Sequence, residues 1–112
     1  MPPREWRIRI EDILGAIDLI HEYTLGMDRR AFGADRRTVD AVVRNLIIIG
    51  EAATHVPDDV ATAHPEIPWA RMRGMRNLAV HEYFGVDEDV LWDTVTVNLP
   101  VLEPLLHNLF EG

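Results

Sequence analysis

Apolar residues recur at helical spacing along almost the whole chain, and this periodicity constrains the fold more than any other feature. In the first segment it predicts a helix from about Arg4 to Leu25. The expected core face of this helix carries Ile10, Ile13, Leu14, Ile17 and Leu25. Gly26 suits its C-terminal cap, because glycine readily adopts the left-handed conformation found there. A short connecting piece around Phe32 follows.

A second long helix is predicted to follow this connection. Asp35 or Thr38 can cap its start, and the pattern ends near His55, before Pro57. Asp58 then begins a brief helical turn. The apolar residues of the long helix are Val39, Val42, Val43, Leu46, Ile47 and Ile49.

The stretch from Pro65 to Trp69 interrupts the helical pattern. Pro68 has no backbone donor and biases the residue before it toward an extended conformation. Trp69 is expected to fill the core at this corner, and a third helix should run from about Trp69 to Tyr83. Gly74 is a weak point inside that helix.

A last helix is predicted from a cap at Asp87. Pro100 and Pro104 lie inside it and should kink it or weaken its first hydrogen bonds. Its apolar residues are Val90, Leu91, Val95, Leu99, Leu102, Leu105 and Leu109. The pattern therefore predicts an all-α, up-down bundle of four main helices with short helical connections, forming one domain over residues 1–112.

The charge balance limits the partners of the protein. Eleven basic residues, all arginines, face nineteen acidic ones, for a formal net charge of −8. Such a chain is repelled by nucleic acid overall, so binding of RNA or DNA needs a local basic patch or a partner protein. Two arginine clusters exist, and the first of them reads most simply as solvated helix surface. The clusters are Arg29, Arg30, Arg36 and Arg37, and Arg71, Arg73 and Arg76.

Cysteine content and hydropathy indicate the cellular compartment of the protein. The chain has no cysteine, which fits a reducing compartment. No apolar run approaches the roughly 20 residues needed to cross a bilayer, and the N-terminus lacks the apolar stretch of a secretory signal. We therefore expect a cytoplasmic protein without a membrane segment.

The segment from Arg76 to Tyr83 carries the most chemistry. It places an arginine, the Asn77 amide, the His81 imidazole and a phenol within about two helical turns. Histidine exchanges protons near neutral pH, and arginine stays charged and binds phosphate bidentately. Such a pair can cleave RNA without a metal: His81 acts on the ribose 2′-hydroxyl or the leaving oxygen, and Arg76 stabilises the negative charge. DNA lacks the 2′-hydroxyl, so the mechanism predicts RNA as the substrate.

The spacing also admits a plainer interpretation, in which His81 is a hydrogen-bonded core or interface group. One histidine does not readily serve as both base and acid in a turnover. A symmetric dimer would supply two histidines and two arginines, so a homodimer is mechanistically attractive.

The motif resembles the R-x4-H-x-Y motif of HepT-like toxins in the HEPN superfamily: Arg76 and Asn77, three residues, then His81, Glu82 and Tyr83. The similarity covers most of the chain. Residues 40–46 and 49–52 resemble the second core helix of the family, residues 65–69 with Gly74 its approach to the motif, and residues 81–87 its exit.

This resemblance implies a ribonuclease toxin of a type VII toxin–antitoxin pair, active as a homodimer. It implies catalytic roles for Arg76 and His81 and a supporting one for Asn77. The implied partner is a minimal nucleotidyltransferase antitoxin of MntA type, which transfers AMP from ATP to Tyr83. The added bulk and negative charge would then block or repel an RNA phosphate.

The remaining candidates are weaker. Glu51, in an apolar stretch, is either an exposed helix-end carboxylate or a partner that orients a motif-side arginine. Arg71 and Arg73 are possible supporting or RNA-contacting residues. No metal or other cofactor is expected, because the other histidines show no metal-ligand spacing. These histidines are His21, His55, His64 and His107.

Three functions remain open from the sequence. The first is a ribonuclease toxin, and the complete set of motif residues favours it. The second is a non-catalytic helical dimer that binds a nucleotidyltransferase as a substrate- or nucleotide-binding module, and the acidic balance favours it. The third is a structural bundle without either activity. His81→Ala would separate the first two, since it should abolish RNA cleavage and leave partner binding intact.

Overall fold

The computed structural model describes the backbone of residues 3–83 and 88–111 and the side chains of residues 5–77 and 88–110. Over these residues the fold is all-α, as predicted, and no strand is present among them. The elements are α1 (Pro3–Thr24), α2 (Arg29–Ala34), α3 (Arg36–Thr54), α4 (Asp58–Ala63), α5 (Trp69–Tyr83), α6 (Glu88–Asp93), the π-helical turn η1 (Thr94–Asn98) and α7 (Leu99–Glu111).

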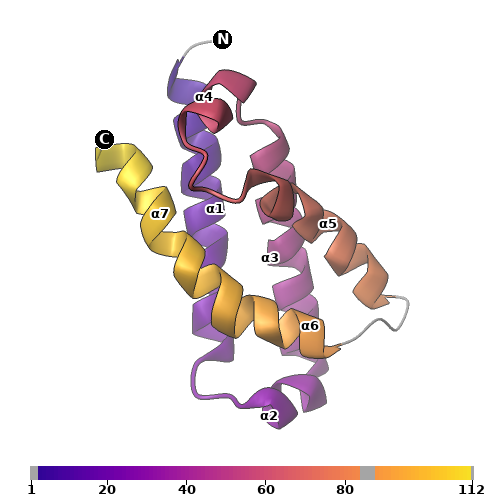
Figure 1. Ribbon diagram of the computed structural model, residues 1–112. Coiled ribbons are helices and arrows are strands. Elements are labelled where there is room, and N and C mark those ends of the chain that lie inside the picture. Colours follow the sequence, from indigo (N-terminus) through magenta and orange to yellow (C-terminus); the bar gives the residue numbers. More distant parts are fainter. Residues whose placement is uncertain (1–2, 84–87, 112) are drawn as a thin grey trace.

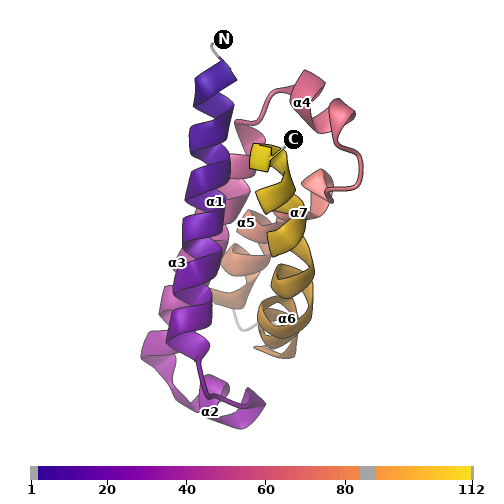
Figure 2. The same ribbon diagram turned by 90° about the vertical axis from the view of Figure 1, so that its left-hand side faces the viewer.

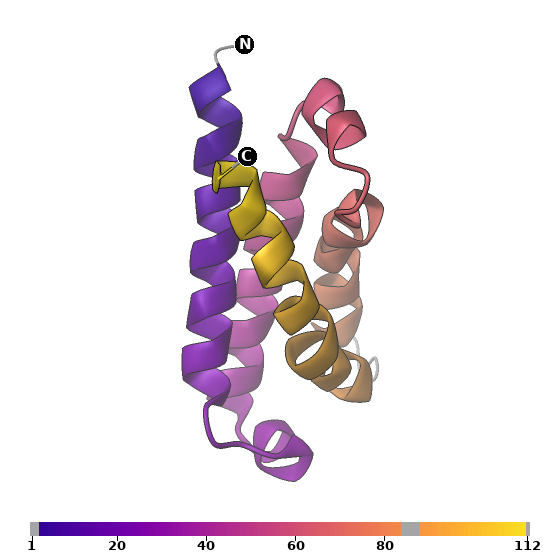
Figure 3. The same cartoon turned by 60° about the vertical axis from the view of Figure 1, so that its left-hand side comes forward.

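Helix α3 is the centre of the bundle. It packs against α1 on one side and α5 on the other, and α7 crosses obliquely over α1 (Figures 1 and 3). Seen from the side, the short α4 lies near the two chain ends, while α2 lies at the opposite end of the molecule (Figure 2). None of the helices in the described part of the chain is long and apolar enough to cross a bilayer.

The core forms where α1, α3, α5 and the C-terminal helices meet. Burying each large aliphatic side chain contributes about 1.5–3 kcal/mol, and α1 and α3 provide most of these residues. The fully buried side chains include Ile10, Ile13, Ile17, Ile20, Val39, Val42, Leu46, Ile49, Met72, Leu91, Leu99 and Leu106. The prediction for Leu25 was wrong: α1 ends at Thr24, and the Leu25 side chain is 85 % exposed.

Local signals set the ends of several helices. Gly26 has a φ of 77°, the left-handed conformation expected after α1. Asp35 caps α3, its carboxylate accepting hydrogen bonds from the Thr38 backbone at 3.3 Å and hydroxyl at 3.0 Å. Trp69 is buried at the start of α5, and its indole Nε1 donates to the His64 carbonyl at 3.0 Å. This bond fixes the entry into the motif helix.

The last helix differs from a regular α-helix in its middle. Residues 94–98 form a wide π-turn, in which the Leu99 amide donates to the Thr94 carbonyl. Pro100 follows directly, lacks an amide hydrogen and would crowd the carbonyl one turn earlier in an α-helix, which the wide turn relieves. Pro104 is accommodated inside α7. The expected cap at Asp87 lies outside the described residues.

Candidate functional site

The motif lies on α5, and the structure describes part of it. Arg76 and Asn77 have exposed side chains in the last half of this helix. The backbone of His81 and Tyr83 belongs to the same helix, so the motif is helical throughout, as predicted. The side chains of His81 and Tyr83 lie outside the described ones, and their roles stay predictions.

The backbone of Arg76 packs directly on α3. A Cβ atom built on Gly50 would lie 2.8 Å from the Arg76 amide nitrogen and 2.9 Å from its Cβ, closer than real Cβ contacts come. Only glycine allows the two helices to approach this closely. Gly50 was not singled out from the sequence as a site residue, because periodicity does not show which residues of two helices touch.

Glu51, next to this contact, pairs with the guanidinium of Arg76. Arg76 Nη1 donates to Glu51 Oε1 at 2.5 Å, and both side chains are about half exposed. This hydrogen bond, and then the positive charge of Arg76, hold the pKa of Glu51 below its ordinary value of 4.5, while burial opposes the shift. The carboxylate therefore remains ionised near neutral pH and orients the guanidinium.

The end of α3 adds a histidine beside this pair. His55 Nδ1 lies 2.8 Å from the Glu51 carbonyl oxygen, so Nδ1 carries the proton in this hydrogen bond and Nε2 is left for other partners. The hydroxyl of Thr54 donates to the same carbonyl at 2.6 Å. The C-terminal turn of α3 is thus tied together by side chains at the level of the ion pair.

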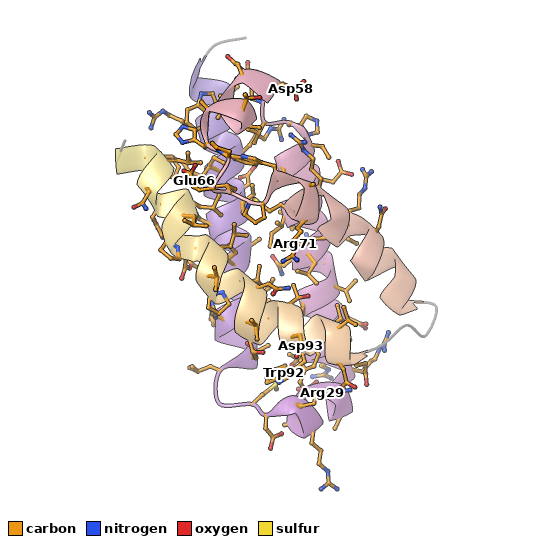
Figure 4. All side chains as sticks on the ribbon, viewed as in Figure 1. Arg29, Asp58, Glu66, Arg71, Trp92 and Asp93 are labelled. Atoms are coloured by element: carbon orange, nitrogen blue, oxygen red, sulfur yellow. The ribbon has the colours of Figure 1, made fainter. Side chains whose placement is uncertain are left out.

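The other two arginines of the cluster take different directions. Arg73 Nε donates to the Ala53 carbonyl at 3.4 Å, which makes a second tie between α5 and α3. Arg71 faces away from α3 and lines a groove between α5 and the η1–α7 segment (Figure 4). The structure thus brings Arg73 and Arg76 together along α3, with Glu51, and separates Arg71 from them.

The groove beside Arg71 has a volume of about 600 Å³ and is mostly apolar. Its polar lining includes Glu66 and Asn98. Val97 and Val101 of its α7 side are more than half exposed. In the described part of the chain, no group of three or more histidine, aspartate or glutamate side chains is arranged to hold a metal ion.

Fold and motif together define a class of protein: an all-α bundle with an arginine–histidine–tyrosine motif on one long helix, as in the HEPN superfamily. A family model described as ribonuclease HepT-like matches residues 13–109. "Probable ribonuclease HepT" of Thermococcus cleftensis is 48 % identical over 100 residues, covering 89 % of this chain and 91 % of the relative.

A more distant relative covers nearly the full length. "Putative RNase MJ0125" of Methanocaldococcus jannaschii is 36 % identical over 111 residues, which are 99 % of this chain and 96 % of the relative. No solved structure matches the chain significantly. On these findings the chain belongs to the HepT-like ribonuclease family of the HEPN superfamily.

Proposed function

We propose that the protein is a metal-independent endoribonuclease, the toxin of a toxin–antitoxin pair, with Arg76, Asn77 and His81 as its catalytic residues. One observation carries this proposal: Arg76 of the R-x4-H-x-Y motif is held in a fixed place, its backbone against Gly50 and its guanidinium against Glu51. A charged group fixed in advance stabilises a transition state more effectively than a mobile one.

The proposed reaction is attack of the ribose 2′-oxygen on the adjacent phosphorus. His81 accepts the 2′-hydroxyl proton or donates one to the departing 5′-oxygen, and Arg76 stabilises the negative charge on the phosphorane. The bond from phosphorus to the 5′-oxygen breaks, which leaves a 2′,3′-cyclic phosphate and a 5′-hydroxyl. Asn77, one helical turn before His81, supports the histidine or a phosphate oxygen by hydrogen bonding.

Glu51 is a positioning residue in this proposal. Its carboxylate orients the Arg76 guanidinium, and an arginine has five donors, so other N–H groups remain for a phosphate. Arg73 donates from Nε to the Ala53 carbonyl and so holds α5 on α3. Contact with RNA through its other N–H groups is a second role in this proposal. Arg71 would contact only RNA that extends over the other side of α5.

The active form in this proposal is a homodimer. The base and the acid of one turnover come from the two copies of His81, and two copies of Arg76 surround the phosphate. Regulation would come from an MntA-like nucleotidyltransferase antitoxin. The Tyr83 oxygen would attack the α-phosphorus of ATP, releasing pyrophosphate, and the attached AMP would bring negative charge to the site.

RNA cleavage by purified wild-type protein and by His81→Ala, with EDTA present, tests this function. We expect cleavage by wild type alone, with 2′,3′-cyclic phosphate ends. If neither protein cleaves RNA and the intact mass shows no AMP on Tyr83, the ribonuclease proposal is wrong for this chain.

A second candidate is the non-catalytic module that binds a nucleotidyltransferase. The charge of residues 88–111 favours it, because they carry five carboxylates and no arginine, which suits a basic partner surface. Co-purification of His81→Ala with the nucleotidyltransferase, combined with a lack of RNA cleavage by wild type, would support this candidate over the first.

A further inference from the structure

A row of charged residues follows α3 beside the motif helix. Arg37, Arg44 and Glu51 follow one another along α3 at intervals of seven residues. Seven residues turn the helix through two full turns less about 20°, so the three side chains share one face of α3. Arg37 and Arg44 are exposed. Since Glu51 of this row pairs with Arg76, the face lies on the α5 side of α3.

The register of the two helices gives the level of Arg44. Gly50 faces Arg76, and the Ala53 carbonyl faces Arg73. A step of three residues toward the C-terminus of α3 therefore corresponds to a step of three residues toward the N-terminus of α5. The helices are therefore antiparallel, as Figures 1 and 3 also show. Continuing this register puts Arg44 level with the last turn of α5, about 10.5 Å along α3 from Glu51.

Three arginines of the described residues form ion pairs with carboxylates, and Arg44 is among those that do not. Arg36 pairs with Asp40 at 3.1 Å, Arg76 with Glu51, and Arg29 with Glu88 and Asp89. No carboxylate among the described residues forms an ion pair with Arg44. Asp40, the acidic residue one turn before it, is already engaged by Arg36. With respect to the described residues, the Arg44 guanidinium is therefore open to an anion from outside the protomer.

The charges of the chain are also segregated. Helices α3 and α5 together carry six arginines and three carboxylates, in a chain whose formal net charge is −8. Among the acidic and basic residues counted in the net charge, residues 88–111 contain only carboxylates. A polyanion is therefore attracted more to α3 and α5 than to residues 88–111, although Arg71 contributes on the groove side of α5 and not along α3. This distribution provides the local basic patch that an acidic RNA-binding protein requires.

We propose that Arg44 is a phosphate-binding residue, which holds the nucleotide of the RNA chain next to the one whose phosphate is bound at Arg76. The RNA then runs along the seam of α3 and α5, toward Arg37. This inference rests on the proposed ribonuclease function and adds to it a binding residue and a direction for the substrate.

RNA binding by Arg44→Gln in the His81→Ala background tests the inference, because this background separates binding from cleavage. The probe is a labelled single-stranded oligoribonucleotide, measured at several salt concentrations. We expect roughly ten-fold weaker binding, and a salt dependence whose slope falls by about 0.7, as for one lost phosphate contact. Arg44→Lys should restore most of the slope but less of the affinity, since it keeps the charge without the bidentate geometry.

The matched control is Arg30→Gln, which removes the same charge from an exposed position on α2, an element that pairs with α6. It should change binding little. If Arg44→Gln and Arg30→Gln bind RNA equally well and with the same salt slope, the inference is wrong.

Cleavage kinetics distinguish this failure from failure of the proposed function. With active protein, Arg44→Gln should lower kcat/KM on a longer oligoribonucleotide by roughly ten-fold, and by less on a dinucleotide, which has only the scissile phosphate. Equal losses on the two substrates would contradict a contact to a neighbouring nucleotide. Absence of cleavage by wild type would contradict the ribonuclease function, while the binding experiment would still report on Arg44.

Discussion

Gly50 supports the backbone of Arg76 so closely that a methyl group at position 50 would lie 2.8 Å from the Arg76 amide nitrogen. The arginine of the motif is therefore positioned by a main-chain contact between α3 and α5. Its guanidinium is positioned separately, by Glu51.

Gly50→Ala should damage both stability and activity. The added methyl group forces α5 away from α3, which should cost about 1–3 kcal/mol in the free energy of unfolding and displace Arg76. Urea denaturation and RNA cleavage measure the two effects. Gly15→Ala is the control: position 15 is exposed on α1 with nothing within 4 Å, so this change should stabilise the protein by about 0.5–1 kcal/mol.

Glu51→Gln should lower kcat by roughly ten-fold, because the neutral amide orients the Arg76 guanidinium less firmly. Glu51→Asp, which keeps the charge, should recover part of the loss. Steady-state kinetics at saturating RNA would measure both. An unchanged kcat in Glu51→Gln would show that Arg76 does not need this partner.

The same pair predicts a pH dependence of stability. The pKa of Glu51 is lowered in the folded protein, so its contribution is present above the ordinary value of 4.5 and is lost as pH falls through the folded value. Wild type should therefore lose more stability than Glu51→Gln below pH 4.5. Since the pair is about half exposed, solvent screening keeps the difference small. Urea denaturation from pH 3 to 7 would measure it.

A nucleotidyltransferase with ATP should no longer inactivate Tyr83→Phe, because this variant lacks the phenolic oxygen that we propose as the AMP acceptor. Intact-mass analysis would check for the missing adduct. Tyr23→Phe, an exposed position on α1, is the matched control, since the chain contains only these two tyrosines. An AMP adduct that persists in Tyr83→Phe would place the modification elsewhere.

Trp69→Phe should lower the free energy of unfolding by about 1 kcal/mol more than the smaller buried ring alone would, because the His64 carbonyl loses its indole donor. Trp92→Phe provides the comparison at a half-buried indole that packs against Phe32 with ring centroids 5.1 Å apart. Thermal unfolding of the two variants would show a larger loss for Trp69→Phe.

Helix positions were largely predictable from the sequence because they follow from local signals. The expected range of the motif helix, from Trp69 to Tyr83, matches α5, and Asp35 caps α3. Which apolar side chains are buried was less predictable near helix ends. Val90, one of the apolar residues of the predicted last helix, is 40 % exposed, because it belongs to the first turn of α6 and borders the groove.

The arrangement around Arg76 was less accessible to sequence analysis. Spacing along one helix shows which residues share a face, but it does not show which residue of another helix lies opposite. Glu51 was considered as a partner for an arginine, and the structure places its carboxylate on Arg76. The roles assigned to Gly50 and Arg44 follow from the antiparallel register of α3 and α5, which spacing along the sequence does not show.

The contact between Gly50 and Arg76 also affects when the entropy of ordering the site is lost. Because α3 holds the backbone of Arg76, the conformational freedom of this residue is given up when the chain folds, together with the rest of the core. In the proposed reaction, RNA would meet an arginine whose main chain is already immobile, so more of the binding free energy would remain for distorting the phosphate toward its transition state.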